Sequence, residues 1–443
     1  MENSLSANTV SQNLIPLLAS WKDLSQAVNS LADANVTSKT VFPADVMGIK
    51  GSLNSFFVSR YMERRRVVRI HEEQYQGKHS SLQEDFVIVV PTKKEADECQ
   101  TDLETILADK VDIVKLPDWE MLPYRPAAKG SAVFGIRAGT LAKLAVGNIR
   151  KERPRVYIIM QRAFLSPLPP PSYIKGLLLS LRKGQEAEPE KLSLHLAKVG
   201  YTRVPRVTTR GEFALRGEVL DIFMPGEEAG HRIVFDFDTI DQIKTFDTET
   251  QSSKANLESL LIYPMKEVVW TDELTTHLEQ IFEKTDKEGI FNDYASFDAK
   301  RKGQGSGTDS SLQSLTEDDK TVAENRKTIQ TGVHLAFSEE ALKEKERILV
   351  ELSVNKMAEG EELFYGVLWD NPCSVLDYVD EYTTVFCLDY ERVSNAKKLL
   401  DNEYTISYRI CRQKIPAPRP DLILFDFHKT IQNHARCINF HTL

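Results

Sequence analysis

A run of arginines leads into a predicted pair of strands near the middle of this sequence. Between Lys198 and Arg216 lie five basic side chains and one acidic side chain, although the whole chain has a formal net charge of −9. Guanidinium groups form paired hydrogen bonds with carboxylates and phosphates. The contrast in charge therefore predicts a docking surface for an acidic partner, either protein or nucleic acid. The five basic residues are Lys198, Arg203, Arg206, Arg210 and Arg216, and the acidic one is Glu212.

The strand pattern that carries Arg216 runs from residue 211 to residue 223 and is interrupted by Gly217. We interpret this glycine as a β-bulge, at which the register of the strand switches. Arg216 and Phe223 would then both face solvent, and an exposed aromatic beside arginines is typical of an interface hot spot. Without the bulge, Phe223 belongs to the core. In the bulged register the inward-facing residues are Phe213, Leu215, Leu220 and Ile222.

The sequence lacks the motifs of the common nucleotide-dependent and hydrolytic enzymes. It contains no GxxxxGK[ST], HExxH, GxSxG or GxGxxG pattern. Residues 48–52 (Gly-Ile-Lys-Gly-Ser) resemble a loop before a helix, either a turn that caps the helix or a weak phosphate site, and no lysine–hydroxyl pair follows Gly51. Asp426 stands in an apolar run without a neighbouring glutamate, so we interpret residues 422–427 as a core strand. We therefore predict no catalytic residue, no cofactor and no metal site.

Composition sets the broad class of the protein. The 443 residues are 41% hydrophobic and 27% charged, as in ordinary globular proteins, and the length suggests two to four domains. No apolar run approaches the roughly 18 residues of a membrane span, and the polar N-terminus has no signal-peptide core. The five cysteines are scattered without a CxxC pair, which predicts reduced thiols. We expect a cytoplasmic protein that does not bind membranes.

The predicted elements form an α/β layer and, after it, a smaller α+β domain that carries the arginines. Residues 1–45, which precede both, have helical periodicity, with Leu14, Leu17, Leu18 and Trp21 at helix spacing. Apolar strands are expected at 85–91, 111–116 and 155–160, with a helix from Lys93, which is typical of an α/β layer with a mainly parallel sheet.

Residues 176–264 have a different texture. A helix at 189–199 and short strands with tight turns predict a small α+β domain. In the strand 232–238, Ile233, Phe235 and Phe237 alternate with Arg232, Val234 and Asp236, as in a half-exposed antiparallel sheet.

The α/β texture returns after a helical, charged stretch at 265–365. Strands are predicted at 383–388, 405–411 and 422–427, so we interpret the small domain as an insertion into a larger α/β domain. The Gly/Ser/Thr/Asp-rich segment 302–319 is predicted to be a flexible, protease-sensitive loop.

Several segments in a consistent order resemble the UvrB-homology region of the bacterial transcription-repair coupling factor (Mfd) family. Residues 116–124 (Leu-Pro-Asp-Trp-Glu-Met-Leu-Pro-Tyr) resemble the D-W-E-x-L-P-Y segment of this family, and 160–162 resemble its M-Q-R. Residues 183–185, 200–203, 211–213, 216–217 and 221–223 follow in the family's order and spacing. The resemblance covers about 45–443 and is strongest from 110 to 265.

The resemblance implies a degenerate, helicase-like (UvrB-like) parallel-sheet domain with a small inserted α+β domain. It divides the chain into an N-terminal helical segment (1–45), domain 1a (46–175), domain 2 (176–264) and domain 1b (265–443, with the flexible insert). In this family domain 2 binds UvrA, and by motif position Arg203, Arg216 and Phe223 match that surface. Arg232 is a fourth candidate, whereas Ala214 replaces a further arginine of the UvrB motif.

The implied function is a non-catalytic adaptor that recruits UvrA to stalled RNA polymerase in transcription-coupled nucleotide excision repair. Family members also contain a polymerase-binding module, a DNA translocase motor and an inhibitory domain, which this sequence does not show, so we expect a fragment. Contact with RNA polymerase and DNA would depend on those modules. The alternatives are a UvrB-like ATPase with an unrecognised nucleotide site and direct DNA binding by the arginines.

Overall fold

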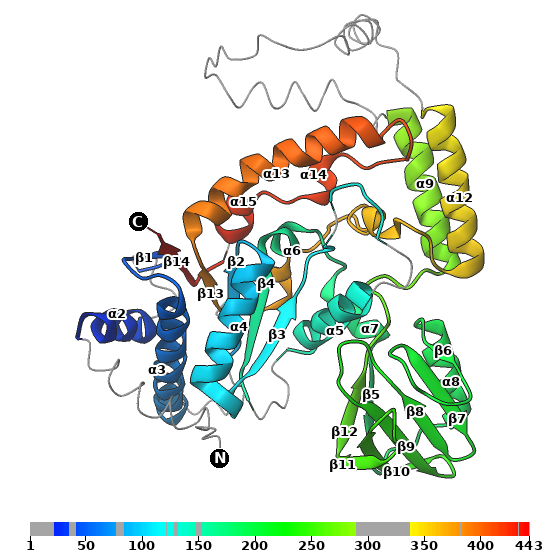
Figure 1. The fold of residues 1–443 in the computed structure, drawn as a ribbon, viewed down its shortest axis with the longest axis horizontal. Coiled ribbons are helices and arrows are strands. Elements are labelled where there is room, and N and C mark those ends of the chain that lie inside the picture. Colours follow the sequence, from blue (N-terminus) through cyan, green and yellow to red (C-terminus); the bar gives the residue numbers. More distant parts are fainter. Residues whose placement is uncertain are drawn as a thin grey trace, which may run out of the picture.

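The computed structural model describes residues 22–34, 41–76, 84–120, 122–127, 132–147, 153–288, 337–380, 383–432 and 434–442 (Figure 1). The predicted helical periodicity at Leu14–Trp21 and the predicted loop at 302–319 lie outside these residues.

A parallel sheet forms the centre of the larger domain. Its six strands have the order β1-β14-β13-β2-β4-β3, and every neighbouring pair is parallel. Strand β2 is buried along its whole length because helices cover both faces of the sheet. The predicted α/β class is therefore confirmed, as are the three strands expected before residue 161. The strands are β1 (Ala44–Met47), β2 (Phe86–Val90), β3 (Asp112–Leu116), β4 (Arg155–Met160), β13 (Thr384–Cys387) and β14 (Cys437–His441).

Two hydrophobic cores lie on opposite faces of this sheet. On one face, Phe86, Ile88 and Val90 of β2 pack against the first group of helices, and on the other, Val87 and Val89 pack against the second group. The first group is α2 (Lys22–Asp33), α3 (Ser52–Gln76) and α4 (Lys93–Leu107). The second is α5 (Ala132–Val146), α6 (Gln161–Leu165), α7 (Pro171–Leu177), α13 (Tyr390–Cys411) and α15 (Phe427–Gln432).

Two predicted C-terminal strands are wrong. Residues 405–411 form the end of the long helix α13, and 422–427 span α14 (Pro420–Ile423) and the start of α15. The β-branched and aromatic residues of α13 suggested a strand, but Val393, Leu400 and Tyr408 are buried at helical spacing against the rest of the domain. Tertiary packing therefore overrides local propensity. The strand that does complete the sheet is β14, which was not predicted, and neither was β1.

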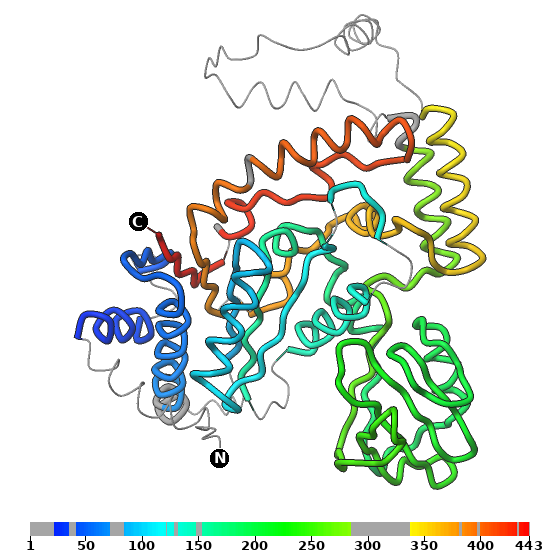
Figure 2. The backbone as a smooth tube through the Cα atoms, in the orientation of Figure 1, coloured from blue at the N-terminus to red at the C-terminus, as the bar shows by residue number. Residues whose placement is uncertain are grey.

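The small domain is inserted between α7 and α9 (Asp272–Glu288), at the lower right of Figure 1. Its six-stranded sheet has the order β11-β10-β9-β8-β7-β6, antiparallel except for the β6–β7 pair. The chain enters through β5 and leaves through β12, which pair as an antiparallel ribbon, and Figure 2 shows both passages at the same side of the domain. Helix α8 (Pro189–Lys198) covers one face of the sheet. The strands are β5 (Leu179–Arg182), β6 (Thr202–Arg203), β7 (Glu212–Arg216), β8 (Val219–Ile222), β9 (Gly230–Asp236), β10 (Thr239–Phe246), β11 (Ser253–Leu257) and β12 (Ser259–Ile262).

A helical hairpin follows the small domain. Helices α9 and α12 (Glu339–Asn355) pack together at the right of Figure 1, with Leu278 and Phe282 of α9 against Ile348 and Leu352 of α12. Ser338 caps α12 by accepting a hydrogen bond from the Ala341 backbone N–H at 3.1 Å. The remaining short helices are η1 (Ala108–Lys110), η2 (Glu361–Phe364) and η3 (Val375–Tyr378).

Candidate protein-interaction surface

The small sheet presents one face to its core and the other outward. Phe213, Leu220, Ile222 and Ile233 point into the core beneath α8. The alternate side chains of the same strands lie on the opposite, outer face, which bears three candidate residues. These alternate side chains are Ala214 and Arg216 of β7, Asp221 of β8, Phe223 just beyond it and Arg232 of β9.

A buried carboxylate joins two of the candidate arginines. Asp221 is fully buried, and its Oδ1 accepts a hydrogen bond from Arg232 Nε at 2.7 Å. Its Oδ2 accepts from Arg232 Nη2 at 3.0 Å and from Arg216 Nη2 at 2.9 Å. Asp221 lies directly opposite Arg232 in the antiparallel register and diagonally from Arg216. One buried acid thus holds two guanidinium groups on the same face.

The two arginines differ in what they leave for a partner. The Arg232 side chain is 19% exposed, its Nη1 also donates to the Gln251 carbonyl, and its Cζ lies 4.7 Å from the centroid of the Phe246 ring. The Arg216 side chain is 50% exposed and gives Asp221 a single hydrogen bond. A guanidinium has five N–H donors, so Arg216 presents most of its donors to solvent.

Phe223 shares the outer face, but the prediction that its ring is exposed is wrong. The residue is 5% exposed and packs with Val207, Ala214 and Phe246, while the Arg210 Cζ lies 4.9 Å above the ring centroid. Phe223 therefore supports Arg210 from below and is part of a second, small core.

Gly217 is not a bulge. Arg216 pairs with Val219 and Phe213 with Ile222, so the register of β7 and β8 is unbroken and residues 217–218 form the hairpin turn between them. The positive φ of 58° at Gly217 is the conformation for which such turns favour glycine. Alternation alone, without a bulge, directs Phe223 away from the main core.

Arg203 stands apart from the other candidates. It is exposed on the edge strand β6, and its parallel pairing with Phe213 places it on the same side of the sheet as that core residue. The following loop returns to the outer face, where Arg206 donates to the Glu249 carbonyl at 3.0 Å and Arg210 to the Glu227 carbonyl at 2.9 Å. The structure thus brings Arg216, Arg232 and Phe223 together and leaves Arg203 at the edge. We call Arg206, Arg210, Arg216 and Arg232 the arginine face.

The only acidic residue of the original basic run is engaged within the loop. The Glu212 carboxylate accepts hydrogen bonds from the Thr208 and Thr209 backbone N–H groups, both at 2.8 Å. It therefore stabilises the loop that carries Arg206 and Arg210.

Comparison with known proteins assigns this part of the chain to a family. Residues 179–268 match the family model described as the UvrB interaction domain. From this match we call the small domain the UvrB interaction domain. The matched range coincides with the structural insertion, from β5 to the segment that follows β12.

Similar full-length proteins are transcription-repair-coupling factors. That of Rickettsia prowazekii is 31% identical over 194 residues, which cover 44% of this chain and 17% of the relative. Those of Haemophilus influenzae and Myxococcus xanthus are each 29% identical, over 41% and 45% of this chain and 15% and 17% of their own length. The chain resembles the N-terminal UvrB-homology region of these factors, and the aligned part spans a minor fraction of their length.

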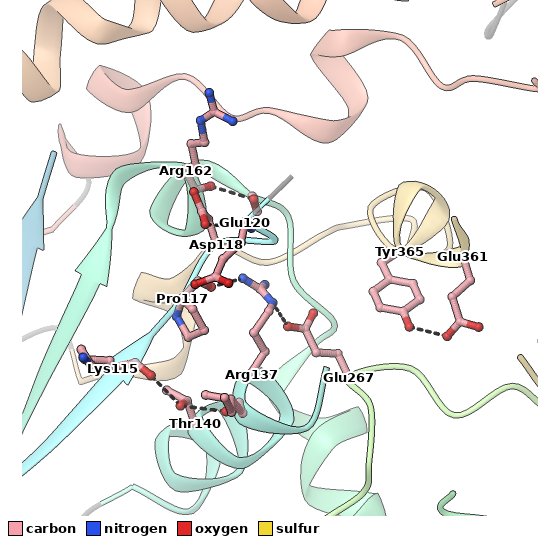
Figure 3. Close-up of polar contacts among 12 residues, drawn as sticks. Lys115, Pro117, Asp118, Glu120, Arg137, Thr140, Arg162, Glu267, Glu361 and Tyr365 are labelled. Atoms are coloured by element: carbon pink, nitrogen blue, oxygen red, sulfur yellow. Dashed lines mark hydrogen bonds and ion pairs between the residues drawn. The ribbon is translucent and has the colours of Figure 1, made fainter. Parts of the chain in front are cut away.

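The D-W-E segment fastens the UvrB interaction domain to the larger domain. The Arg137 side chain of α5 is fully buried, with its Cζ 4.3 Å from the centroid of the Trp119 ring, and donates to the Pro117 carbonyl at 2.6 Å. Its Nε also pairs with the fully buried Glu267, which lies on the segment leaving the domain (Figure 3). On the same segment, Lys266 pairs with Glu361 at 2.9 Å. These contacts hold the segment that leaves the UvrB interaction domain against the larger domain.

Helix α5 also contacts the UvrB interaction domain through two glycines. A Cβ at Gly135 would lie 2.2 Å from Pro225 Cβ, and one at Gly139 would lie 2.9 Å from the Tyr263 ring. Only glycine allows this close approach, which fixes the orientation of the inserted domain.

Ion pairs occupy the edge of the parallel sheet beside residues 48–51, the loop predicted to be either a turn that caps a helix or a weak phosphate site. Strand β1, residues 48–51 and helix α3 form a strand–loop–helix unit, and both Gly48 and Gly51 have positive φ. The Ser52 hydroxyl donates to Asp102 at 3.1 Å. Beside the loop, His441 contacts Asp45 at 2.8 Å and Glu391 at 2.5 Å.

A second set of contacts at the same edge joins Arg392 to Glu95 at 2.6 Å and to Asp389 at 3.4 Å. Four carboxylates and two basic groups therefore meet where polyphosphate would require an excess of positive charge. The described residues contain no group of three or more His, Cys, Asp or Glu suited to a metal ion.

The prediction for β9 was wrong for Phe237, which lies on the surface. Phe237 does not continue the alternation, because β9 ends at Asp236 and residues 237–238 form the turn to β10. Its side chain is 82% exposed. The flanking Asp236 and Asp238 are the one signal in the sequence that would have indicated a turn here.

Proposed function

We propose that this chain is a non-catalytic adaptor of transcription-coupled nucleotide excision repair, in which the arginine face of the UvrB interaction domain binds UvrA. The observation that carries the proposal is the half-exposed Arg216 held beside Arg232 by the buried Asp221, within residues that match the UvrB interaction domain. The similarity to transcription-repair-coupling factors supports the repair context.

Each candidate residue has a role in this proposal. Arg216 is the central contact, since guanidinium groups fixed by a buried acid are preorganised for carboxylates of a partner. Arg232 holds Asp221 in place and contributes its exposed edge, Phe223 positions Arg210, and Arg203 makes a peripheral contact from the edge strand. We further propose that the α/β domain comprises 46–175 and 265–443 and that the UvrB interaction domain comprises 176–264; the family match continues to residue 268, in the connecting segment.

A binding titration with purified UvrA tests the proposal. We expect Arg216→Ala to weaken binding by about 30-fold, the usual hot-spot scale, with little loss of stability because Asp221 keeps its paired hydrogen bonds with Arg232. Arg203→Ala should weaken binding less. The matched control is Arg182→Ala on the ribbon strand β5, outside the arginine face, which should bind as the parent does. Unchanged UvrA affinity for Arg216→Ala would remove the arginine face from the interface.

Direct DNA binding is the competing use of the same arginines. Phosphate contacts lose affinity steeply between about 50 and 200 mM salt. Tight binding of DNA with that salt dependence, together with no binding of UvrA, would favour this alternative.

By extension from the names of its relatives, we infer that a longer protein containing this module brings UvrA to stalled RNA polymerase in the cytoplasm. No helix within the described residues is long and apolar enough to cross a membrane. A co-precipitation of UvrA with a stalled transcription complex, with and without the Arg216→Ala change, tests this step.

A further inference from the structure

Outside residues 71–76 of helix α3, Phe237 is the one exposed aromatic side chain among the described residues. Every other Phe, Tyr or Trp in that part of the chain is buried or half-buried, whereas the Phe237 ring is 82% exposed. It occupies the two-residue turn between β9 and β10, which the Asp236–Thr239 pair closes.

The backbone at Phe237 is strained. Its φ of 55° lies in the left-handed region, which is unfavourable for a bulky side chain, and turns at this position favour Gly, Asn or Asp. The exposed ring gains no packing energy to offset this cost. Stability therefore does not account for a phenylalanine here, and strained residues of this kind concentrate at functional sites.

The turn is held firmly despite its exposure. The Asp238 carbonyl accepts a hydrogen bond from the Ala187 N–H at 2.7 Å, and Ile240 exchanges backbone hydrogen bonds with Gln185 and Gly184 at 2.9 and 2.7 Å. A ring on a fixed turn loses little freedom when a partner covers it, which favours binding.

Phe237 lies at the same end of the sheet as Arg216. Arg216 pairs with Val219, Val219 pairs with Val234, and the Phe235 N–H donates to the Glu218 carbonyl at 2.8 Å. Strand spacing then separates Phe237 from Arg216 by about 10 Å across the sheet and about 10 Å along it. Both positions fit within one interface of standard size. The contacts with α5 are at the opposite end of β8, so the turn points away from the larger domain.

The charge around Phe237 is opposite to that of the arginine face. Glu218, Asp236 and Asp238 are all exposed around the turn. A partner that covers both regions must therefore present acidic groups to the arginines and basic groups to the turn, which fixes its orientation.

We propose that Phe237 is an anchor that inserts into an apolar pocket of UvrA rimmed by lysine or arginine side chains. This inference rests on the proposed function and adds to it a second contact region of opposite charge. The aromatic hot spot of this surface is then Phe237, in place of Phe223.

The variant Phe237→Gly separates binding from folding. Glycine removes the ring and relieves the positive φ, so the melting temperature should equal or exceed that of the parent, while the UvrA dissociation constant should rise at least tenfold. The matched control is Leu194→Ala, which truncates another exposed apolar side chain of the same domain (72% exposed) and should leave binding unchanged. The double variant Asp236→Asn/Asp238→Asn should lower the association rate and its salt dependence.

The outcomes distinguish this inference from the proposed function. If Arg216→Ala weakens UvrA binding and Phe237→Gly does not, the anchor is refuted and the arginine face stands. If the parent chain does not bind UvrA, both fail.

Discussion

At the scale of single residues, the outer face of the UvrB interaction domain combines one buried acid with several arginines at different depths. Asp221 is fully buried and joins Arg216 to Arg232, and the ring of Phe223 lies beneath Arg210. Substituting an exposed side chain on this face should affect binding, whereas substituting a buried one should affect stability. A binding assay must therefore be combined with a measurement of stability.

Phe223→Ala should destabilise the domain by about 3–5 kcal/mol, the usual cost of truncating a buried aromatic. The cavity would lie among Val207, Ala214 and Phe246. Thermal and denaturant melts of Phe223→Ala and Phe223→Leu measure the effect, and the leucine variant should lose less because it fills most of the volume. A fully stable alanine variant would contradict the buried position.

Glu362 should make stability depend on pH. Burial raises the pKa of this carboxyl to about 7, although its Oε1 accepts a hydrogen bond from the Ala127 N–H at 2.7 Å. A raised carboxyl pKa favours the protonated folded state, so the cost of ionisation appears as pH rises from about 4.5 to about 7. On the order of 3 kcal/mol of stability should be lost across that window, at about 1.4 kcal/mol per pKa unit.

Glu362→Gln should remove this pH dependence, since the amide keeps the acceptor and cannot ionise. Denaturant titrations at pH 5 and pH 8 compare it with the parent and with Glu279→Gln, a change of an exposed residue on α9. If the free energies of unfolding of the parent and of Glu362→Gln differ by the same amount at pH 5 and at pH 8, the raised pKa of Glu362 is contradicted.

The candidate site could be predicted only in part from the residues. The predicted register correctly placed Phe213, Leu220 and Ile222 in the core and Arg216 outside, although it assumed a bulge at Gly217, which is instead the hairpin turn. The sequence pattern could not show that the loop bearing Arg210 folds over Phe223. That loop, residues 204–211, contacts Phe223 only in the folded structure. For the same reason Asp221 was not predicted as part of the site. In the sequence it resembles any surface carboxylate, and only the strand register places it between two arginines.

At the scale of elements, helix α5 forms a close-packed contact between the two domains. Its glycines allow Pro225 and Tyr263 to approach the helix backbone, and its Arg137 pairs with Glu267 on the exit segment. The orientation of the UvrB interaction domain thus depends on residues far from the arginine face.

Gly135→Ala should destabilise this contact between the domains by about 1–3 kcal/mol, the usual cost of overpacking. The matched control is Gly176→Ala on α7, where an added Cβ meets nothing within 4 Å and should be neutral or slightly stabilising. Melting temperatures and limited proteolysis at 264–271 compare the two. Equal behaviour of both variants would argue against a close-packed contact.

Strands with apolar runs were predictable because burial on both faces of a parallel sheet leaves a simple signal, as in β2. Strands β1 and β14 were missed because Asp45, Asn439 and His441 interrupt that signal. These polar side chains contact one another: Asn439 Nδ2 donates to Asp45 Oδ1 at 3.1 Å, and His441 Nε2 lies 2.8 Å from the same oxygen. The partners are almost 400 positions apart, so only the fold reveals that they meet.

At the scale of the whole molecule, the α/β domain has a strand–loop–helix unit, from β1 to α3, that is bordered by ion pairs. The edge beside residues 48–51 holds Asp45, Glu95, Asp389 and Glu391 in closed ion pairs.

We expect neither tight ATP binding nor ATP hydrolysis by this chain. A titration with a fluorescent ATP analogue and a phosphate-release assay test the expectation. Turnover that disappears on changing Lys50 or Ser52 would overturn it, because Lys50 lies in the loop between β1 and α3 and Ser52 is the first residue of α3. Turnover that survives both changes would point to a contaminating enzyme.

The paired strands β5 and β12 make the inserted domain a transplantable unit. Leu179 lies opposite Ile262, so the two points at which the chain crosses into the domain are about 5 Å apart. A host needs only one surface loop with ends at that spacing to accept residues 179 to 262, and closing so small a gap costs the host little chain entropy. The same recognition surface can therefore be carried by proteins of different architecture, and grafted into a new one, without redesign of its core.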